Sequence, residues 1–222
     1  MSTKKSTNLE KSGGDLARRR GRPLGGGNTP EQARRLLVDA AEACFAQRGM
    51  ETTMAEVARE AGVTRAVLYR HFAGREELVV AVAVKVMDRY VAQVVRDLMP
   101  TDDVENLITE SLVFVTTVVS RDPLLILLAA SGEHGFASLL ANSSILSAKV
   151  AGLYEQVFVL FRDQLRPGLE PADVGHYILA VALSLLMDVV PGTNDPDTVR
   201  RYARTFVLPA IIASPPRATP VF

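Results

Sequence analysis

Apolar residues recur at helical spacing along most of the chain, and capping residues or helix breakers separate the segments. In the first such segment, apolar side chains at positions 37, 40, 41, 44 and 45 share one helix face. Thr29, Pro30 and Gln32 supply an N-cap hydroxyl, a proline at the first helical position and a capping-box glutamine. Gly49 is a suitable stop. A first helix is therefore expected between Thr29 and Gly49.

Two shorter helices are expected next. Thr53 is an N-cap, and Glu56, three residues later, can hydrogen bond back to its amide, so a helix begins here and ends at Gly62. Thr64 is a second capping residue, and the helix that it opens runs to Phe72.

A long helix is expected from Arg75 to Met99, where Pro100 stops it. The same signals predict further helices over 103–120, 124–140, 145–165, 171–190 and 197–212. The valine-rich run 113–119 is compatible with a strand, but its length and helical neighbours favour a helix. The pattern predicts an all-α fold: a three-helix unit, then a larger helical domain.

Residues 1–28 have a different composition. They are polar and basic and end in three glycines, and such a segment cannot bury enough apolar surface to offset its ordering entropy. We expect a flexible basic extension over 1–28, a three-helix unit over 29–74 and a larger helical domain over 75–222. Residues 75–99 would form the linking helix.

Composition places the chain among ordinary globular proteins. It has 222 residues, 48% of them hydrophobic, which suffices for a sizeable core. Cys44 is the only cysteine and excludes an intrachain disulfide. The longest apolar runs, 124–130 and 177–187, are shorter than the roughly 18–20 residues of a membrane span, and residues 1–15 contain no apolar signal core. A cytoplasmic protein without membrane association is expected.

The formal net charge of zero conceals a division. Residues 1–75 contain 14 Lys and Arg against 8 Asp and Glu, whereas the remainder contains 11 against 17. Seven of the basic residues lie within residues 1–22. Such a block is typical of an arm that binds a polyanion, although a solvated tail is an alternative.

The segment 53–72 carries the functional signal, because two short helices joined by a tight glycine turn form a helix-turn-helix. Ala58 is small where the helices cross, and Gly62 allows the chain to leave the first helix with positive φ. Val57, Val63, Leu68 and Phe72 would close a small core. The second helix then presents hydroxyls and cations, which bind phosphates and base edges: Thr64, Arg65, Ala66, Tyr69, Arg70 and His71.

At these residues the chain resembles the DNA-binding domain of the TetR (tetracycline-repressor) family of bacterial transcription regulators. The resemblance lies in residues 53–64, 68–72 and 75–78, with Arg75 where the family commonly has Lys and Gly74 in place of a small polar cap. It implies a homodimer that places two recognition helices in successive major grooves of a palindromic double-stranded operator. It also implies a C-terminal domain whose ligand, through the linking helix, changes the separation of those helices.

The resemblance implies phosphate contacts for Thr53, Thr64, Tyr69, His71 and Arg75, and base contacts for Arg65, Ala66 and Arg70. Simple packing or a solvated helix end is the alternative for Tyr69 and His71. The sequence Arg20-Gly21-Arg22-Pro23 looks like the core of an AT-hook, so Arg20 and Arg22 are expected in a narrow minor groove. A diffuse electrostatic arm is the alternative.

The C-terminal half offers candidates for a ligand cavity. The apolar candidates are Phe114, Leu127, Leu128, Phe136, Leu140, Tyr154, Phe158 and Met187, and the polar ones are Arg121, His134, His176, Ser184 and Asp188. Each is also compatible with an ordinary core or surface position. Scarce aromatic residues favour a small, largely apolar effector. The apolar faces of the segments beginning at Ile145 and Pro171 are suited to a dimer interface, which the family commonly builds from its last two long helices before the terminal one.

An enzyme is the first competing interpretation. His71, His134 and His176 are widely separated, so the sequence shows neither a Cys/His pair nor a metal-binding cluster. No glycine-rich phosphate loop follows a strand. We expect no catalysis, no metal and no cofactor. An architectural DNA-binding protein or an activator remains compatible with the same domain.

Overall fold

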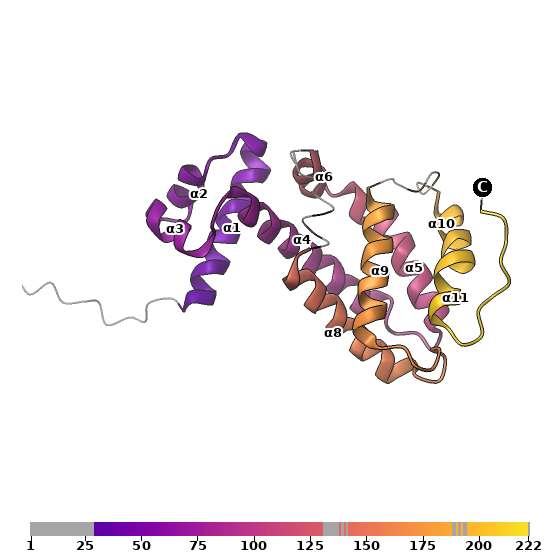
Figure 1. Ribbon diagram of the computed structural model, residues 1–222. Helices are drawn as coiled ribbons and strands as arrows, with labels where there is room; N and C mark the ends of the chain where they lie inside the picture. The colour runs from indigo at the N-terminus through magenta and orange to yellow at the C-terminus, as the bar shows by residue number, and fades with distance from the viewer. Residues whose placement is uncertain are drawn as a thin grey trace, which may run out of the picture.

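The computed structural model describes residues 29–130, 138, 140, 142–187, 190, 192 and 195–221. Within these residues the secondary structure is helical, apart from one isolated bridge between Leu165 and Ile212. A small helical unit lies at one end of an elongated molecule and a larger bundle at the other, with one long helix joining them (Figure 1). The prediction of an all-α fold is confirmed.

The small unit consists of α1 (Pro30–Arg48), α2 (Met54–Glu60) and α3 (Arg65–His71), and α4 (Arg75–Asp97) leads away from it. The expected capping box of α1 is present: the Thr29 hydroxyl accepts from the Gln32 amide at 3.2 Å, and the Thr29 amide donates to the Gln32 side chain at 2.9 Å. A short 3-10 turn, η1 (Gly49–Glu51), follows α1 at the predicted glycine stop.

The larger bundle contains α5 (Val104–Thr117), α6 (Pro123–Ala130), α8 (Ser144–Phe161), α9 (Pro171–Leu186), α10 (Pro196–Tyr202) and α11 (Leu208–Ile211). A 3-10 turn, η2 (Val119–Arg121), continues α5, and a π-helical segment (Ala203–Val207) joins α10 to α11. The helix expected over 197–212 is thus three consecutive pieces. Of the helix expected over 124–140, residues 131–137 and 139 lie outside the described residues.

Helices α8 and α9 form the closest pair in the bundle, and a glycine permits it. Gly175 on α9 is buried, and a Cβ at this position would lie 3.3 Å from the Ala151 Cα and 3.4 Å from the Val150 carbonyl oxygen on α8. A larger side chain would meet backbone atoms, which cannot turn aside. The two helices therefore pack as one close pair.

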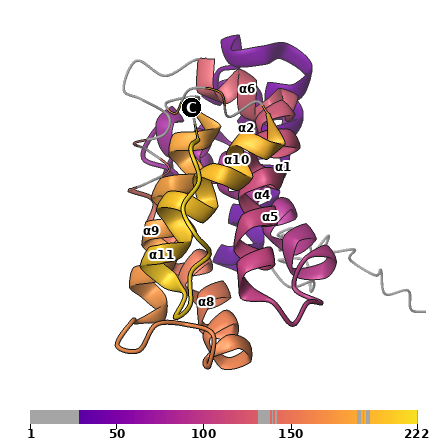
Figure 2. The same cartoon turned by 90° about the vertical axis from the view of Figure 1, so that its right-hand side faces the viewer.

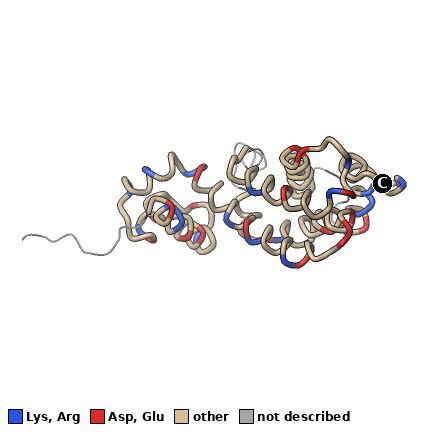
Figure 3. The backbone as a smooth tube through the Cα atoms, turned by 90° about the horizontal axis from the view of Figure 1, so that it is seen from below, with Lys and Arg blue, Asp and Glu red and all other residues tan. Residues whose placement is uncertain are grey.

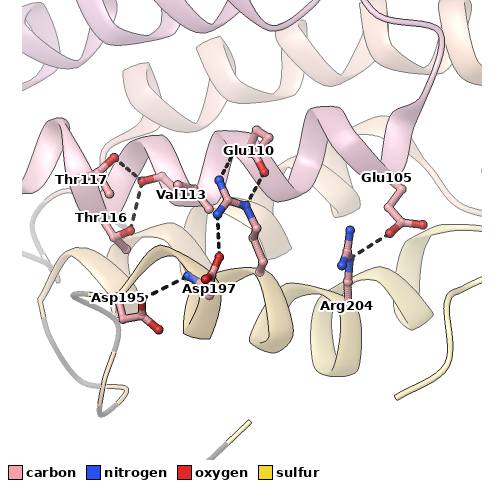
Figure 4. A network of polar contacts seen from close by, with 9 residues as sticks. Glu105, Glu110, Val113, Thr116, Thr117, Asp195, Asp197 and Arg204 are labelled. Atoms are coloured by element: carbon pink, nitrogen blue, oxygen red, sulfur yellow. Dashed lines mark hydrogen bonds and ion pairs between the residues drawn. The ribbon is translucent and has the colours of Figure 1, made fainter. Parts of the chain in front are cut away.

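Ion pairs join α10 to α5, and the two helices lie side by side in Figures 2 and 4. The Arg200 guanidinium donates to both Glu110 carboxylate oxygens, at 2.7 and 2.9 Å, and to Asp197 at 2.9 Å. One turn further on, Arg204 donates to Glu105 at 3.1 Å. The hydrogen bonds from Arg200 lower the pKa of Glu110.

We expect the Glu110→Gln substitution to lower the free energy of unfolding by about 1 kcal/mol at neutral pH, because it removes a two-pronged ion pair that is only partly exposed. Since the folded pKa of Glu110 is lowered, the pair stabilises the protein above the pKa of the unfolded carboxyl. That contribution is lost as the pH falls through the folded pKa, so the two proteins should converge in acid. Urea unfolding over a pH series measures this.

Glu105→Gln is the matched control, because Glu105 accepts one bond at 3.1 Å from the more exposed Arg204. This substitution should lower the free energy of unfolding by less than Glu110→Gln does. Equal costs for both substitutions, or a Glu110→Gln effect that does not change with pH, would contradict this account of the α5–α10 contact.

Candidate nucleic-acid interface

The α2–α3 unit is built as the sequence predicts. Thr53 and Glu56 form a complete capping box: the Glu56 carboxylate accepts from the Thr53 amide and hydroxyl, each at 2.8 Å, and the Thr53 hydroxyl accepts from the Glu56 amide at 3.3 Å. These bonds from Thr53 lower the pKa of Glu56. Gly62 has a φ of 67°, a left-handed conformation that only glycine adopts freely, so α3 can turn across α2.

A small apolar core fixes the two helices. Val57, Ala58, Leu68 and Phe72 are at most 2% exposed, whereas Val63, also expected in this core, is half-buried against it. Thr64 caps α3 by accepting from the Val67 amide at 3.4 Å. The core holds one face of α3 inward and thereby fixes which residues point away from the protein.

The outer face of α3 carries the residues expected to contact DNA. Thr64, Arg65, Ala66 and Arg70 are exposed, the Tyr69 ring is 52% exposed, and His71 is half-buried. Lys and Arg lie along the helices of this unit together with Asp and Glu (Figure 3). The available groups are hydroxyls, guanidinium groups and one methyl group, which suit phosphate oxygens, guanine edges and the thymine methyl respectively.

The structure brings four of the candidates together. Thr53, Arg65, Tyr69 and Arg75 line one open hollow of about 550 Å³ between the start of α2 and the outer face of α3. These four residues bring two guanidinium groups and two hydroxyls to the hollow, Thr52 adds a third hydroxyl, and no carboxylate except Glu51 lines it. Such a set of donors is suited to the phosphate backbone. Thr64, Ala66, Arg70 and His71 do not line this hollow.

Arg75 also has an internal role that the sequence did not indicate. Its guanidinium donates to the Met50 carbonyl oxygen and, at 3.5 Å, to that of Thr52, and it lies 5.8 Å from the centre of the Phe45 ring. These contacts join the start of α4 to the turn between α1 and α2. The backbone that carries Thr53 is therefore held by Arg75.

A charged network that the sequence analysis missed joins α1 to α4. Lys85 bridges Asp39 and Glu42, and Arg89 pairs with Glu42 at 2.6 Å. Burial alone would raise the pKa of Glu42, but hydrogen bonds from Lys85 and Arg89 outweigh it and lower the pKa. The sequence did contain an indication of this network. Lys85 and Arg89 lie four residues apart on one helix, and Asp39 and Glu42 lie three residues apart on another.

One contact joins the middle of α4 to the larger bundle. The Tyr90 hydroxyl donates to the Asp122 carboxylate at 2.6 Å, and its ring meets Phe114 edge-on with ring centres 5.9 Å apart. The other Asp122 oxygen accepts from the amides of Leu124 and Leu125 at the start of α6. Burial and the bond to Asp122 raise the pKa of Tyr90 to about 12. One carboxylate thus joins α4 to α6.

The candidate ligand residues occupy different environments. Leu128 and Tyr154 are buried in the core, Phe114, Phe158 and Met187 pack against it, and the Ser184 hydroxyl donates to the Val181 carbonyl. Leu127 is half-buried on α6, and Leu140 is buried. Burial raises the pKa of Tyr154. By contrast, Arg121 and His176 are exposed. Arg20, Arg22, His134, Phe136 and Asp188 lie outside the described residues.

A search for metal-binding groups among the described residues finds no cluster of three or more His, Cys, Asp or Glu side chains that could hold an ion. Cys44 is buried on α1, on the apolar face expected for it.

Comparison with known proteins gives a match in the same region. Residues 37–82 match the model of the family described as "Bacterial regulatory proteins, tetR family". This part of the chain is therefore similar to the DNA-binding region of TetR-family regulators. The match covers the second half of α1, the helix-turn-helix and the beginning of α4, which together contain every described residue of the candidate interface.

Relatives extend the match over part of the chain. It is 44% identical over 52 residues to the HTH-type transcriptional regulator TtgR of Pseudomonas putida, which is 23% of this chain and 25% of TtgR. It is 43% identical over 98 residues to the HTH-type transcriptional activator FasR of Mycolicibacterium smegmatis, covering 40% of this chain and 44% of FasR. The chain thus spans from a quarter to under half of the length of these TetR-type relatives.

The fold of the whole chain also has solved counterparts. The structure of QsdR, a transcriptional repressor from the TetR family of R. erythropolis, superposes with a TM-score of 0.63 over 77% of this chain and 92% of that protein. The sequence identity is 20%. The likeness shows that this part of the chain shares the fold of that protein.

We expect Arg75→Gln to lower the free energy of unfolding by about 1–2 kcal/mol, because two backbone carbonyls lose a charged donor. Arg75→Lys should recover only part of this loss, since a single ammonium cannot reproduce the guanidinium fork. Arg70→Gln, at an exposed position on α3, is the control and should change stability by less than about 0.5 kcal/mol. Urea unfolding compares the three variants. Equal stability of Arg75→Gln and Arg70→Gln would refute the internal role.

Proposed function

We propose that this protein is a sequence-specific transcription regulator that binds a palindromic DNA operator as a homodimer and responds to a small effector. The observation that carries the proposal is the exposed outer face of α3, which a buried helix-turn-helix core holds in a fixed orientation. A surface of hydroxyls and guanidinium groups on a short rigid helix has the dimensions and chemistry of a major-groove reader.

The residue roles follow from position. Thr53, Tyr69 and Arg75 line the hollow suited to phosphate, and Thr64 and His71 lie at the two ends of α3, where the DNA backbone passes. Arg65 and Ala66 open α3 and are placed to read bases, with Arg70 as a third reader. In this proposal Arg20 and Arg22 add minor-groove contacts beside the operator. The protein would act in the cytoplasm, at the nucleoid.

Exposed apolar side chains on α8 and α9 support the homodimer. Val159 is 82% exposed, Leu160 61% and Tyr177 37% in the isolated chain, which is costly for a surface in water. The segment Ser144–Gln164 is, by length and composition alone, apolar enough to cross a membrane. Only 22% of its most apolar part is buried inside the structure, so much apolar surface is exposed in the single chain. One side of α8 is covered by α9, which packs closely against it through Gly175. We therefore assign the exposed outer side of α8 to a partner copy.

The effector would occupy the larger bundle. Phe114, Leu128, Tyr154, Phe158 and Met187 are proposed as its apolar wall and Ser184 as a polar contact, with Arg121 and His176 at the surface; His134, Phe136 and Asp188 complete the proposed set. Phe114 touches Tyr90, so a ligand beside Phe114 would act on the bond between α4 and Asp122. Such a ligand would favour one of two α4 positions, which is a population shift. Release of a repressor is the favoured outcome, since QsdR is a repressor; FasR, an activator, shows the alternative.

Selection of bound sequences from random duplex DNA tests the proposal. A palindrome is expected, with half-site centres about 34–36 Å apart, because two α3 helices must enter successive major grooves. Arg65→Gln should weaken binding of the selected site by roughly 10–100-fold and relax one base position in each half-site. Arg59→Gln, at an exposed position on α2, is the control and should keep the same preference.

The same assay distinguishes the contribution of residues 1–22 to DNA binding from that of α3. Removal of residues 1–22 is expected to weaken binding and flatten the dependence of affinity on salt, while the preferred sequence is retained. An unchanged affinity and salt slope would contradict a role for Arg20 and Arg22. Salt-sensitive binding without any preferred sequence would overturn the proposed function itself.

We expect Val159→Glu to weaken dimerisation by at least about thirtyfold, because an unpaired charge buried in an interface costs roughly 2–5 kcal/mol. The fold of each subunit should persist, since the side chain is 82% exposed in the single chain. Ile126→Glu on α6, where the native residue is 53% exposed, is the matched control. Sedimentation equilibrium measures the association. Equal dimerisation of both variants would remove α8 from the interface.

A further inference from the structure

A groove lies where the DNA-binding unit meets the larger bundle, and neither the helix-turn-helix nor the effector candidates use it. It is a hollow of about 530 Å³ lined by residues of α1, α4 and the start of α8, and Figure 1 shows α4 running between the other two helices. Val38, Ala81, Val84 and Ile145 make its apolar surface, and Ile145 is 45% exposed. We call it the domain-junction groove.

Most charged groups around this groove already have partners. Lys85 pairs with Asp39, and Lys149 with Asp88 at 3.1 Å. The Arg34 guanidinium pairs with Glu77 at 3.3 Å and lies 4.4 Å from the centre of the Phe72 ring. These pairs neutralise the Asp39 and Asp88 carboxylates that would otherwise repel an anion.

Two charged residues of the groove differ from the rest. Arg35 forms no hydrogen bond or ion pair within the part of the chain that the structure describes. Glu31 lies in the first turn of α1, where hydrogen bonds to its own backbone and to Thr29 lower its pKa, and the positive charge of Arg35 lowers it further. The negative charge of Glu31 is thus stabilised by its own helix end. Arg35 attracts Glu31 but donates no hydrogen bond to it, so its N–H groups remain available beside the apolar residues of the groove.

We propose that the domain-junction groove binds a compact amphipathic organic anion, such as an aryl sulfonate or aryl carboxylate. The flat apolar body lies against Ile145 and Val84, and the anionic group accepts hydrogen bonds from Arg35, with Lys149 close by. A volume of about 530 Å³ is within the range of small-molecule sites. A guanidinium binds a two-oxygen anion through two parallel hydrogen bonds, which fixes its orientation.

A molecule in this groove would bridge α1 of the DNA-binding unit and α8 of the larger bundle. It would therefore hold α3 in one orientation relative to α8. The consequence for operator affinity rests on the proposed function, but binding of the anion does not. The two can fail separately, because binding is measured without DNA.

The test is a titration of the full chain with 2-naphthalenesulfonate, followed by methyl NMR of isoleucine-labelled protein. The chain has isoleucines at 108, 126, 145, 178, 211 and 212, of which Ile145 alone lines the groove. The Ile145 methyl signal is expected to shift and saturate, and the exposed Ile126 signal to stay in place. Neutral 2-naphthalenemethanol should bind about five- to tenfold more weakly, as should the sulfonate to Arg35→Gln, because each loses a charge-assisted hydrogen bond.

Arg162→Gln is the matched control, since Arg162 is an exposed cation at the other end of α8 and should leave the affinity unchanged. Equal affinities of Arg35→Gln and Arg162→Gln would overturn the proposal. So would shifts confined to isoleucines of the bundle interior, which would place the anion there. An Ile145 signal that moves only with protein concentration would show instead that a second copy covers the groove.

Discussion

Burial of the first half of α4 is the constraint on which the rest of the structure depends. Leu78, Val82 and Val86 recur every four residues and are fully buried in the core that α1 and α4 share. Each such side chain contributes roughly 1.5–3 kcal/mol, so α4 cannot separate from α1 without losing most of the stability of the small unit. Because α3 is held on the same core, its direction follows that of α4. One turn beyond Val86, Tyr90 already contacts the larger bundle.

The charged network on α1 and α4 has a different physical role from the apolar core. Partly exposed ion pairs add little stability, but Lys85 and Arg89 meet Asp39 and Glu42 only when the two helices are in one register. The core therefore holds α4 to α1, and the ion pairs fix its position along the helix axis. The second half of α4 then meets the larger bundle, where Asp122 joins α4 to α6.

The sequence predicted the local structure well because its signals are local. The capping boxes at Thr29 and Thr53 and the left-handed Gly62 each depend on a few neighbouring residues, and all are present as expected. Contacts between residues distant in sequence were missed. These are the hydrogen bond from Arg75 to the Met50 carbonyl, the charged network between α1 and α4, and the Tyr90–Asp122 hydrogen bond. The spacing of apolar residues predicts which face of a helix is buried, but not which other helix packs against that face. The ligand candidates show the same limit, since the pattern did not distinguish the exposed Arg121 and His176 from the buried Tyr154.

The position of α8 connects these features. Gly175 lets α9 approach α8 until a Cβ would touch the Ala151 backbone, so the pair is stiff, and its outer side carries exposed Val159 and Leu160. In the proposed dimer, α8 would be the fixed reference, and the tilt of α4 against it would set the distance between the two α3 helices. Asp88 on α4 pairs with Lys149 on α8 at the edge of the domain-junction groove. That groove therefore lies between the two units, where a bound molecule would act on the angle between them.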